Sequence, residues 1–301
     1  MIINELLKEM SIEFDCPENI EFDSLGLVSY NNGDRVCTFV DNDKFLDNLS
    51  SCIVLVLTNK EVAPLLREKY PNIDLCIVEN PRLTYFLIHQ HLVGNKEYER
   101  KTFNTIIGKN CNISKMACIA EENVIIGDNV TIEEFCTIKP NTVIGNNSVI
   151  RSGNVIGAEG FEIKTMNEDY LFVVKHLGGV IIGENVEIQH NCCINKAIYP
   201  WDNTILGDNV KVDDLVHMGH GVKIDKRTKV VTHTVVGGRT KVGKDVWLGI
   251  GCLIRNGMVI GDNARVNMGA VVTRNVEAGA SVTGNFAVDH RKFLENLKKI
   301  R

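Results

Sequence analysis

Two histidines stand close together in the segment His217-Met218-Gly219-His220. An imidazole can accept a proton near neutral pH, so each of the two is a candidate general base. Gly238 follows further along the same region of the chain. Its backbone amide has no side chain in the way and could stabilise a developing oxyanion. A base and an amide donor of this kind would serve acyl transfer together, provided that the fold stacks position 238 on position 220.

The same region carries an apolar residue at every sixth position, twelve times in succession. A period of six matches neither the 3.6-residue period of a helix nor the alternation of a strand. It is typical of one flat face of a triangular coil, so three such hexads would complete one turn of a parallel β-helix. A residue three hexads later, as Gly238 is to His220, would then lie about 4.8 Å above its predecessor. The apolar positions are Leu206, Val212, Met218, Ile224, Val230, Val236, Val242, Leu248, Ile254, Ile260, Val266 and Val272.

Further hexads precede this run, and two segments interrupt them. The six-residue steps begin near residue 105 and bring the total to about 24 hexads, or about eight coils. Glycines follow several of the apolar residues, where a tight corner needs a backbone without Cβ. The pattern breaks at 158–179 and again at 195–205. Loops on a regular scaffold tend to carry function, so we expect both segments to form external loops.

The first hundred residues have a different pattern. Short apolar runs at 53–57 and 75–78 predict covered strands, and they alternate with predicted helices at 60–69 and 82–92. This alternation indicates a small domain of sheet and helices. The chain as a whole is therefore predicted to be mainly β. Its predicted parts are an N-terminal α/β domain at 1–103, a parallel β-helix domain at 104–284 and a short basic C-terminal helix at 285–301.

The composition argues against several classes of protein. The 301 residues carry a net charge of −5 without a long basic block, so nucleic acid is not expected as a partner. No stretch approaches the roughly 18 apolar residues of a membrane span, and the N-terminus does not have the pattern of a signal peptide. The ten cysteines are then expected to be reduced and mostly buried, as Cys252 in its coil position illustrates. We expect a cytoplasmic protein with no metal site and no permanently bound cofactor.

Three segments resemble one known family. They read VIRSGNVIGAEGFEI at 149–163, GGVIIGENVEI at 178–188 and TILGDNVKVDDLVHMGHGVKI at 204–224. They resemble LpxD-type UDP-3-O-acyl-glucosamine N-acyltransferases, and the resemblance covers nearly the whole chain. It implies a left-handed β-helix, which is an exception to the right-handed crossover rule. It also implies a homotrimer and N-acyl transfer from acyl carrier protein or coenzyme A to a nucleotide-linked amino sugar, for lipid A or surface-glycan synthesis.

The resemblance also implies roles for residues of the repeat region. His220 matches the family's catalytic histidine, and Gly238 matches the glycine whose amide stabilises the oxyanion. Asp213 matches an acidic position seven before the histidine and could orient its imidazole. Gly237 and Gly257 are expected beside the acyl donor. His217 should lie outside the core, where it could contact substrate or be solvated.

Other residues are expected to bind the acceptor. The segment TFVDNDKF resembles the family's uridine-binding segment, in which two aromatics and an asparagine hold the nucleotide. Here these are Phe39, Asn42 and Phe45, so the N-terminal domain is expected to bind the nucleotide. Because aromatic residues in strands usually belong to the core, a structural role for Phe39 and Phe45 stays open. His176 stands in the first break, where the family keeps a glutamine, and could contact the sugar.

Departures from the family pattern concern the substrate more than the reaction. Asn195-Lys196-Ala197 replaces an Asp-Arg-Gly triplet and is followed by an extra Tyr-Pro-Trp. Met258 stands where the family has a second histidine, and Phe45 replaces its usual tyrosine.

Two other function classes stay open. The fold also resembles γ-carbonic anhydrases, which hold zinc between histidines of adjacent coils. His190, His217, His220 and His233 are candidate ligands, but their spacings of 27, 3 and 13 do not stack one coil apart. A scaffold that binds a sugar nucleotide without turning it over is the other alternative.

Overall fold

The computed structural model describes residues 1–30, 34–167, 170–284, 287 and 289–300. The chain forms two compact units. The first unit contains Met1–Lys101, Phe161–Leu177 and Ile198–Trp201. The second contains Thr102–Gly160, Gly178–Ala197 and Asp202–Arg301. The middle of each segment that interrupts the hexads therefore belongs to the first unit and not to the coils.

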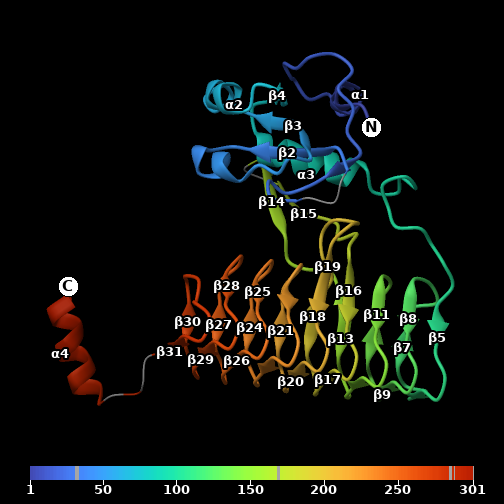
Figure 1. The fold of residues 1–301 in the computed structure, drawn as a ribbon, viewed down its shortest axis with the longest axis vertical. Helices are drawn as coiled ribbons and strands as arrows, with labels where there is room; N and C mark the ends of the chain where they lie inside the picture. The colour runs from blue at the N-terminus through green and yellow to red at the C-terminus, as the bar shows by residue number, and fades with distance from the viewer. Residues whose placement is uncertain (31–33, 168–169, 285–286, 288, 301) are drawn as a thin grey trace. The chain divides into compact units, whose positions relative to one another are not determined.

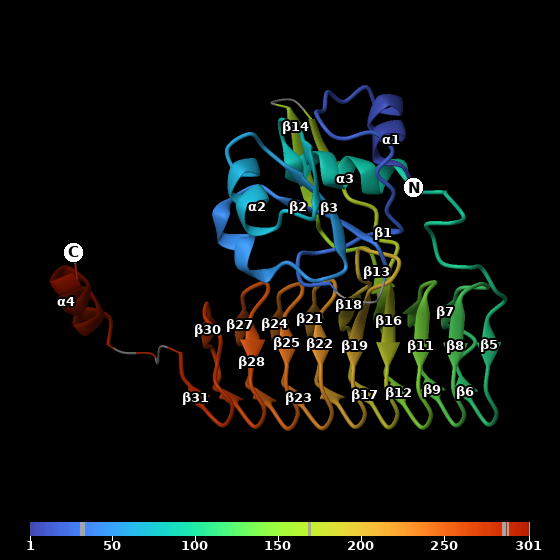
Figure 2. The ribbon, with the colours of Figure 1, turned by 45° about the horizontal axis from the view of Figure 1, so that its top comes forward.

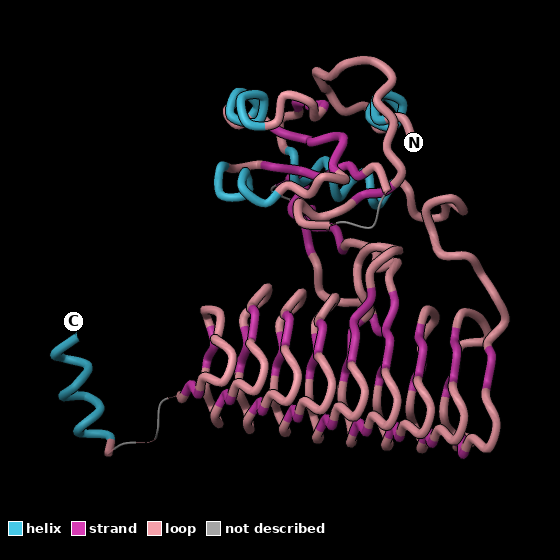
Figure 3. The backbone as a smooth tube through the Cα atoms, in the orientation of Figure 1, coloured by secondary structure: helices cyan, strands magenta, loops and turns pink. Residues whose placement is uncertain are grey.

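The second unit is a parallel β-helix, as the hexads predict. Its strands form three parallel sheets of eight, eight and nine strands, one on each side of the prism (Figure 1). Leu206 pairs with Ile224, and Met218 pairs with Val236. One coil therefore takes three hexads in this region, and the tube drawing in Figure 3 shows the coils repeating along the axis.

Most of these strands are only two residues long, because a corner follows each of them. The first sheet contains β5 (Ile106–Ile107), β8 (Val124–Ile126), β11 (Thr142–Ile144), β16 (Gly179–Ile182), β19 (Asn203–Leu206), β22 (Lys223–Ile224), β25 (Lys241–Val242) and β28 (Val259–Ile260). The second contains β6 (Asn112–Ile113), β9 (Thr131–Ile132), β12 (Val149–Ile150), β17 (Glu187–Ile188), β20 (Lys211–Val212), β23 (Lys229–Val230), β26 (Trp247–Leu248), β29 (Arg265–Val266) and β31 (Ser281–Val282). The third contains β7 (Cys118–Ile119), β10 (Thr137–Ile138), β13 (Val155–Ala158), β18 (Cys193–Asn195), β21 (His217–Met218), β24 (Val235–Val236), β27 (Leu253–Ile254) and β30 (Val271–Val272).

The hexad residues fill the interior of the prism. All twelve from Leu206 to Val272 are at most 5% exposed. The position two residues before each of them also points inward, and its threonines satisfy their hydroxyl groups on the backbone: Thr234 Oγ1 donates to Gly249 O at 3.1 Å. At the open end of the prism the first hexad residue, Ile107, is 50% exposed, because no coil covers it from below.

The corners bring the backbones of successive coils into close contact. A Cβ on Gly145 would lie 2.5 Å from the carbonyl carbon of Gly183, so a side chain cannot fit there. Another position of the corner has a left-handed backbone, and asparagine often occupies it, as at Asn209 with φ of 59°. Asparagine tolerates this conformation better than most residues.

The first unit is an α/β domain. Its sheet has four parallel strands in the order β1 (Ser24–Leu25), β2 (Val36–Val40), β3 (Ile53–Thr58) and β4 (Asp74–Ile77). Its helices are α1 (Ile3–Glu9), the 3-10 helix η1 (Asp43–Asn48), α2 (Ala63–Lys69) and α3 (Pro81–His91). The predicted strands and helices of this region correspond to β3, β4, α2 and α3, and α3 lies against β2 and β3 (Figure 2).

The interrupting segments supply part of the core of this first unit. The first contains an antiparallel hairpin of β14 (Ile163–Asn167) and β15 (Tyr170–Val173). Phe172 and Leu177 of this segment pack in one cluster with Tyr85, and so do Ile198 and Tyr199 of the second segment. The two segments are thus built into the small domain and are not free surface loops.

The C-terminal segment forms the predicted helix, α4 (His290–Ile300). Among the helices that the structure describes, none combines the length and the apolar character that a membrane crossing requires.

Leu215 offers a test of the corner conformation. It has φ of 59° and is 48% exposed, whereas Asn191 occupies the corresponding corner of the preceding coil with φ of 57°. A leucine in left-handed backbone costs roughly 1 kcal/mol. Leu215→Asn should therefore raise the free energy of unfolding by about 0.5–1 kcal/mol, measured by denaturant titration. Val235→Asn, at an exposed strand position, is the control and should give no such rise; an equal gain in both variants would contradict the explanation.

Candidate active site

His220 and Gly238 meet at one corner of the β-helix. Gly238 is buried beneath the imidazole: a Cβ added to it would lie 2.7 Å from Nε2 of His220 and 2.9 Å from Cδ2. The two coils are joined here by the Arg239 N–H, which donates to the carbonyl of His220 at 2.8 Å. Glycine at position 238 therefore makes room for the histidine ring. The spacing of three hexads places the His220 ring against the backbone of Gly238.

Three more glycines belong to this corner. A Cβ on Gly219 would lie 2.6 Å from the amide nitrogen of Gly238, and one on Gly237 would lie 2.4 Å from Asn256 Oδ1. The N–H of Gly257 donates to the carbonyl of Gly238 at 2.9 Å. In the described part of the chain, no backbone carbonyl accepts the N–H of Gly238. The proposal that this amide serves as an oxyanion donor rests on this missing backbone acceptor.

Charged side chains next to His220 were not predicted from the sequence. A Cβ on Gly221 would lie 3.1 Å from Asp202 Oδ2 and 3.6 Å from Cγ of Arg239. Lys223 Nζ donates to Asp202 Oδ1 at 2.6 Å. Asp202 stands at the end of the second interrupting segment, where no six-residue pattern places it. Lys223 directly precedes the apolar hexad residue Ile224, and residues at that position point outward. This position was the one sequence signal for a charge on the surface here.

His217 lies on the strand that leads to this corner. It belongs to β21, pairs with Cys193 and Val235, and is partly buried. Burial lowers the pKa of His217 below its ordinary value, because desolvation disfavours the charged ring. A neutral imidazole is thus favoured on the strand that leads to His220.

Asp213 lies at a different corner. Asp213 lies between β20 and β21, whereas His220 follows β21. The strand β21 of the third sheet therefore separates the corners of the two residues. Asp213 Oδ1 accepts the N–H of Asp214 at 2.9 Å, and its Oδ2 accepts the N–H of Thr232 at 3.1 Å. The second of these bonds holds two coils together. The contacts of Asp213 therefore give it a structural role at its own corner, in place of the predicted contact with the imidazole.

The two remaining histidines of the β-helix have their own partners. His190 Nδ1 lies 2.9 Å from Asp214 Oδ1, and the bonds from His190 lower the pKa of that carboxyl group. His233 Nδ1 lies 2.9 Å from Thr232 Oγ1. Within the described residues, no three histidine, cysteine or acidic side chains are grouped closely enough to hold a metal ion.

The predicted nucleotide-binding residues lie in the first unit, around the carboxyl end of β2. Phe39 is partly exposed, packs against Tyr85 at 5.0 Å between ring centroids, and has the Arg82 guanidinium 5.5 Å from its own centroid. Asn42 Oδ1 accepts the N–H of Lys44 at 3.1 Å and so caps η1. Phe45, within η1, is 38% exposed. Phe39 therefore has a packing role, and Phe45 presents an aromatic surface to solvent.

His176 is placed differently from its prediction. It is 1% exposed, and its Nδ1 lies 2.9 Å from the carbonyl oxygen of Val174. It belongs to the first unit, with the rest of the hairpin segment. Because the side chain of His176 has almost no accessible surface, it cannot contact a sugar in this structure. The structure therefore gives no support to the predicted contact between His176 and the sugar.

Comparison with known proteins places the chain in a family. The family model described as bacterial transferase hexapeptide (six repeats) matches residues 123–158 and 239–274, and the hexapeptide repeat of succinyl-transferase matches residues 104–134. A UDP-3-O-acylglucosamine N-acyltransferase of Helicobacter hepaticus is 34% identical over 255 residues, which cover 79% of this chain and 77% of that protein. The enzyme of that name from Delftia acidovorans is 34% identical over 138 residues, 46% of this chain. The match spans only 40% of the Delftia protein's length.

Solved structures share the fold. A UDP-N-acetylglucosamine acyltransferase from Campylobacter jejuni superposes with a TM-score of 0.54 at 19% identity, over 65% of this chain and 78% of that chain. LpxA, a UDP-N-acetylglucosamine acyltransferase from Bacteroides fragilis, gives 0.51 at 24% identity, over 60% and 66%. These structures bear on the fold alone. Because the Helicobacter relative aligns along most of both chains, this chain belongs to the UDP-3-O-acylglucosamine N-acyltransferase family of left-handed β-helix acyltransferases.

Proposed function

We propose that this chain transfers an acyl group from a thioester donor to the amine of a nucleotide-linked amino sugar. The observation that carries the proposal is the contact between the His220 imidazole and the backbone of Gly238, where a Cβ would lie 2.7 Å from Nε2. A proton acceptor and a backbone amide donor at one point are the two groups that acyl transfer needs. The names of the relatives make a UDP-linked, 3-O-acylated glucosamine the first acceptor to test.

In the proposed reaction, the amine nitrogen of the sugar attacks the carbonyl carbon of the thioester. His220 removes a proton from that nitrogen as the new C–N bond forms. The carbonyl oxygen gains negative charge and accepts the N–H of Gly238. When the tetrahedral intermediate collapses, the C–S bond breaks, and the thiolate leaves with the proton held by the imidazolium. The products are an amide and a free thiol, and the histidine is again neutral.

The charges around the corner are consistent with an anionic substrate. Asp202 Oδ2 and the side-chain stem of Arg239 lie against Gly221, and Lys223 Nζ donates to Asp202 Oδ1, so this part of the surface carries two basic side chains and one acidic one. Both a nucleotide diphosphate and the phosphopantetheine arm of a thioester carry phosphate, and lysine and arginine are the usual partners of phosphate. Acyl carrier protein and acyl coenzyme A are both retained as donors, because this arrangement does not distinguish them.

A homotrimer stays a prediction from the family. An apolar stripe runs along the outer side of the third sheet, in register with His217: Val235 is 37% exposed, Leu253 45% and Val271 65%. Exposed apolar stripes of this kind often mark contacts between subunits or with ligands. Packing of three copies along this face would cover the stripe and leave a cleft beside His220.

The function is tested by incubating the purified chain with UDP- and dTDP-linked amino sugars, with and without a 3-O-acyl group, in separate reactions with acyl coenzyme A and acyl carrier protein. Mass spectrometry should detect an N-acylated sugar nucleotide. His220→Ala should lower the rate by about a hundredfold or more through loss of the base. His233→Ala, an exposed corner histidine, is the control and should retain the rate. Binding without product in every reaction would favour the scaffold alternative.

Gly238→Ala tests the corner geometry. The added Cβ would lie 2.7 Å from Nε2, so the ring must move away from the amide. We expect kcat to fall about a hundredfold or more, the usual scale for loss of a positioned general base, with little change in KM for the sugar nucleotide. Gly279→Ala, at a corner with open space around it, is the matched control and should affect only stability. A Gly238→Ala enzyme with full kcat would contradict the proposed role.

Phe45→Ala tests nucleotide binding in the first unit. If the exposed ring stacks on the uracil, its loss should raise KM for the sugar nucleotide about tenfold or more and leave kcat within about twofold. Leu65→Ala removes a similarly exposed apolar side chain from α2 and should change neither constant. An unchanged KM for Phe45→Ala would show that its ring does not contact the nucleotide.

A further inference from the structure

A short segment near the N-terminus pairs with the outer strand of the four-stranded sheet. β4 lies at the edge of this sheet, and Asp15 bridges to Ile77 in antiparallel orientation. The N–H of Asp15 donates to the carbonyl of Ile77 at 3.0 Å, and the N–H of Ile77 donates to the carbonyl of Asp15 at 2.8 Å. Two residues that exchange both bonds form the hydrogen-bonded type of antiparallel pair.

This register places two cysteines opposite each other. One step along the pair, Cys16 faces Cys76 at the non-hydrogen-bonded position, where the Cα atoms of antiparallel strands lie about 4.5 Å apart. Disulfides span Cα separations of about 4.4–6.8 Å, so the backbone at this position already suits a disulfide. The two thiols lie close enough for each to shift the pKa of the other. Both are free thiols in the structure.

The two sulfur atoms have different surroundings. Cys76 is fully buried in the core of the first unit, whereas Cys16 is partly exposed. Asn4 Nδ2 lies 3.3 Å from Cys16 Sγ and donates to it. The hydrogen bond from Cys76 lowers the pKa of Cys16, and the same bond together with burial raises the pKa of Cys76. Cys16 is therefore the thiol that ionises more readily and that an oxidant in solution can reach.

We propose that Cys16 and Cys76 are an oxidation site, which peroxide converts to an intramolecular disulfide within the native fold. The Cys16 thiolate attacks one peroxide oxygen, the O–O bond breaks, and the sulfur becomes a sulfenic acid while one water forms on protonation. The Cys76 thiol then attacks that sulfur, the S–S bond forms and a second water leaves. In total, two thiols lose two electrons and two protons to one molecule of peroxide.

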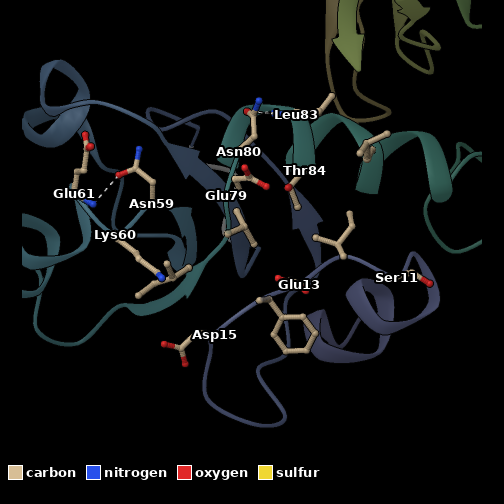
Figure 4. Close-up of a pocket in the computed structure, with 15 residues that line it drawn as sticks. Ser11, Glu13, Asp15, Asn59, Lys60, Glu61, Glu79, Asn80, Leu83 and Thr84 are labelled. Atoms are coloured by element: carbon tan, nitrogen blue, oxygen red, sulfur yellow. Dashed lines mark hydrogen bonds between the residues drawn. The ribbon is translucent and has the colours of Figure 1, made fainter. Parts of the chain in front are cut away.

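The disulfide would fix one side of a cleft. Figure 4 shows Ser11, Glu13 and Asp15 on the N-terminal segment, opposite residues that follow β3 and β4, such as Lys60 and Glu79. The cleft has a volume of about 1030 Å³. A bond from Cys16 to Cys76 would hold the N-terminal segment against β4 and close a loop of the chain between the two residues. Such a cross-link restricts the unfolded chain and should stabilise the unit.

The test is to oxidise the purified full chain with hydrogen peroxide, alkylate the remaining thiols, digest without reductant and identify linked peptides by mass spectrometry. The Cys16–Cys76 peptide should exceed any other linked pair about tenfold, because no diffusion is needed to bring these sulfurs together. The oxidised chain should also melt about 5 °C or more above the reduced chain, and a reductant should reverse the rise.

Cys37→Ser is the matched control, since Cys37 is buried in the same core but faces Leu25 and Leu55 on its neighbouring strands. That variant should form the linked peptide as the natural chain does. Cys16→Ser should form none and show no reversible rise in melting temperature; because Cys16 is partly exposed, this variant is preferred to a change at the buried Cys76. The proposal would be overturned if the exposed Cys118 were fully oxidised while Cys16 was still recovered in its alkylated form, because alkylation shows that Cys16 had remained a thiol. So would a linked peptide without a reversible rise, since the bond would then have formed in unfolded chains.

Discussion

The spacing between successive coils is the constraint on which the rest of the second unit depends. Parallel strands hold the coils at hydrogen-bonding distance, and at corner positions where two backbones meet this distance leaves no room for a Cβ. Gly145 shows the effect at an ordinary corner, with the backbone of Gly183 at 2.5 Å from the place of its missing Cβ. At Gly238 the same space is occupied by the ring of His220. A feature that the fold requires at several corners thus becomes, at one of them, the place of the proposed general base.

This constraint explains why so much of the β-helix could be predicted from the sequence. The period of six fixes which residue points inward, and three periods fix which residues stack, so the stacking of Gly238 on His220 follows from counting, whereas their roles came from the family resemblance. The prediction does not depend on distant parts of the chain, because each coil contacts chiefly the next one. Interior positions such as Met218 and Val236 are correspondingly buried and paired as expected.

Two predicted contacts, those of His176 and Asp213, differ from what the structure shows, and they do so for different reasons. His176 belongs to a segment that interrupts the hexads, and its surroundings are set by the core of the first unit, where Phe172 and Leu177 pack. Asp213 does stand on the repeat, but the period gives only its corner. Whether its carboxylate contacts an imidazole or the backbone of the next coil depends on local geometry that spacing does not encode. Asp202 and Lys223 were missed for the same reason, since an ion pair beside the site has no periodic signal.

The departures from the family pattern at 195–197 can be understood through a chain of backbone contacts. Thr204, a buried residue of β19, donates its hydroxyl to the carbonyl of Asn195 at 2.6 Å, and its oxygen accepts the N–H of Gly221 at 2.9 Å. The Thr204 hydroxyl therefore links Gly221, the residue after His220, to Asn195 at the start of the second interrupting segment. The groups that it joins, an N–H and a carbonyl, both belong to the main chain. Main-chain groups are present whatever side chain occupies position 195, so the triplet can change without moving the corner of His220. What does change is the surface: Lys196 pairs with Glu159 at 3.6 Å, and a different charge at either position would alter this surface and leave the proposed base in place.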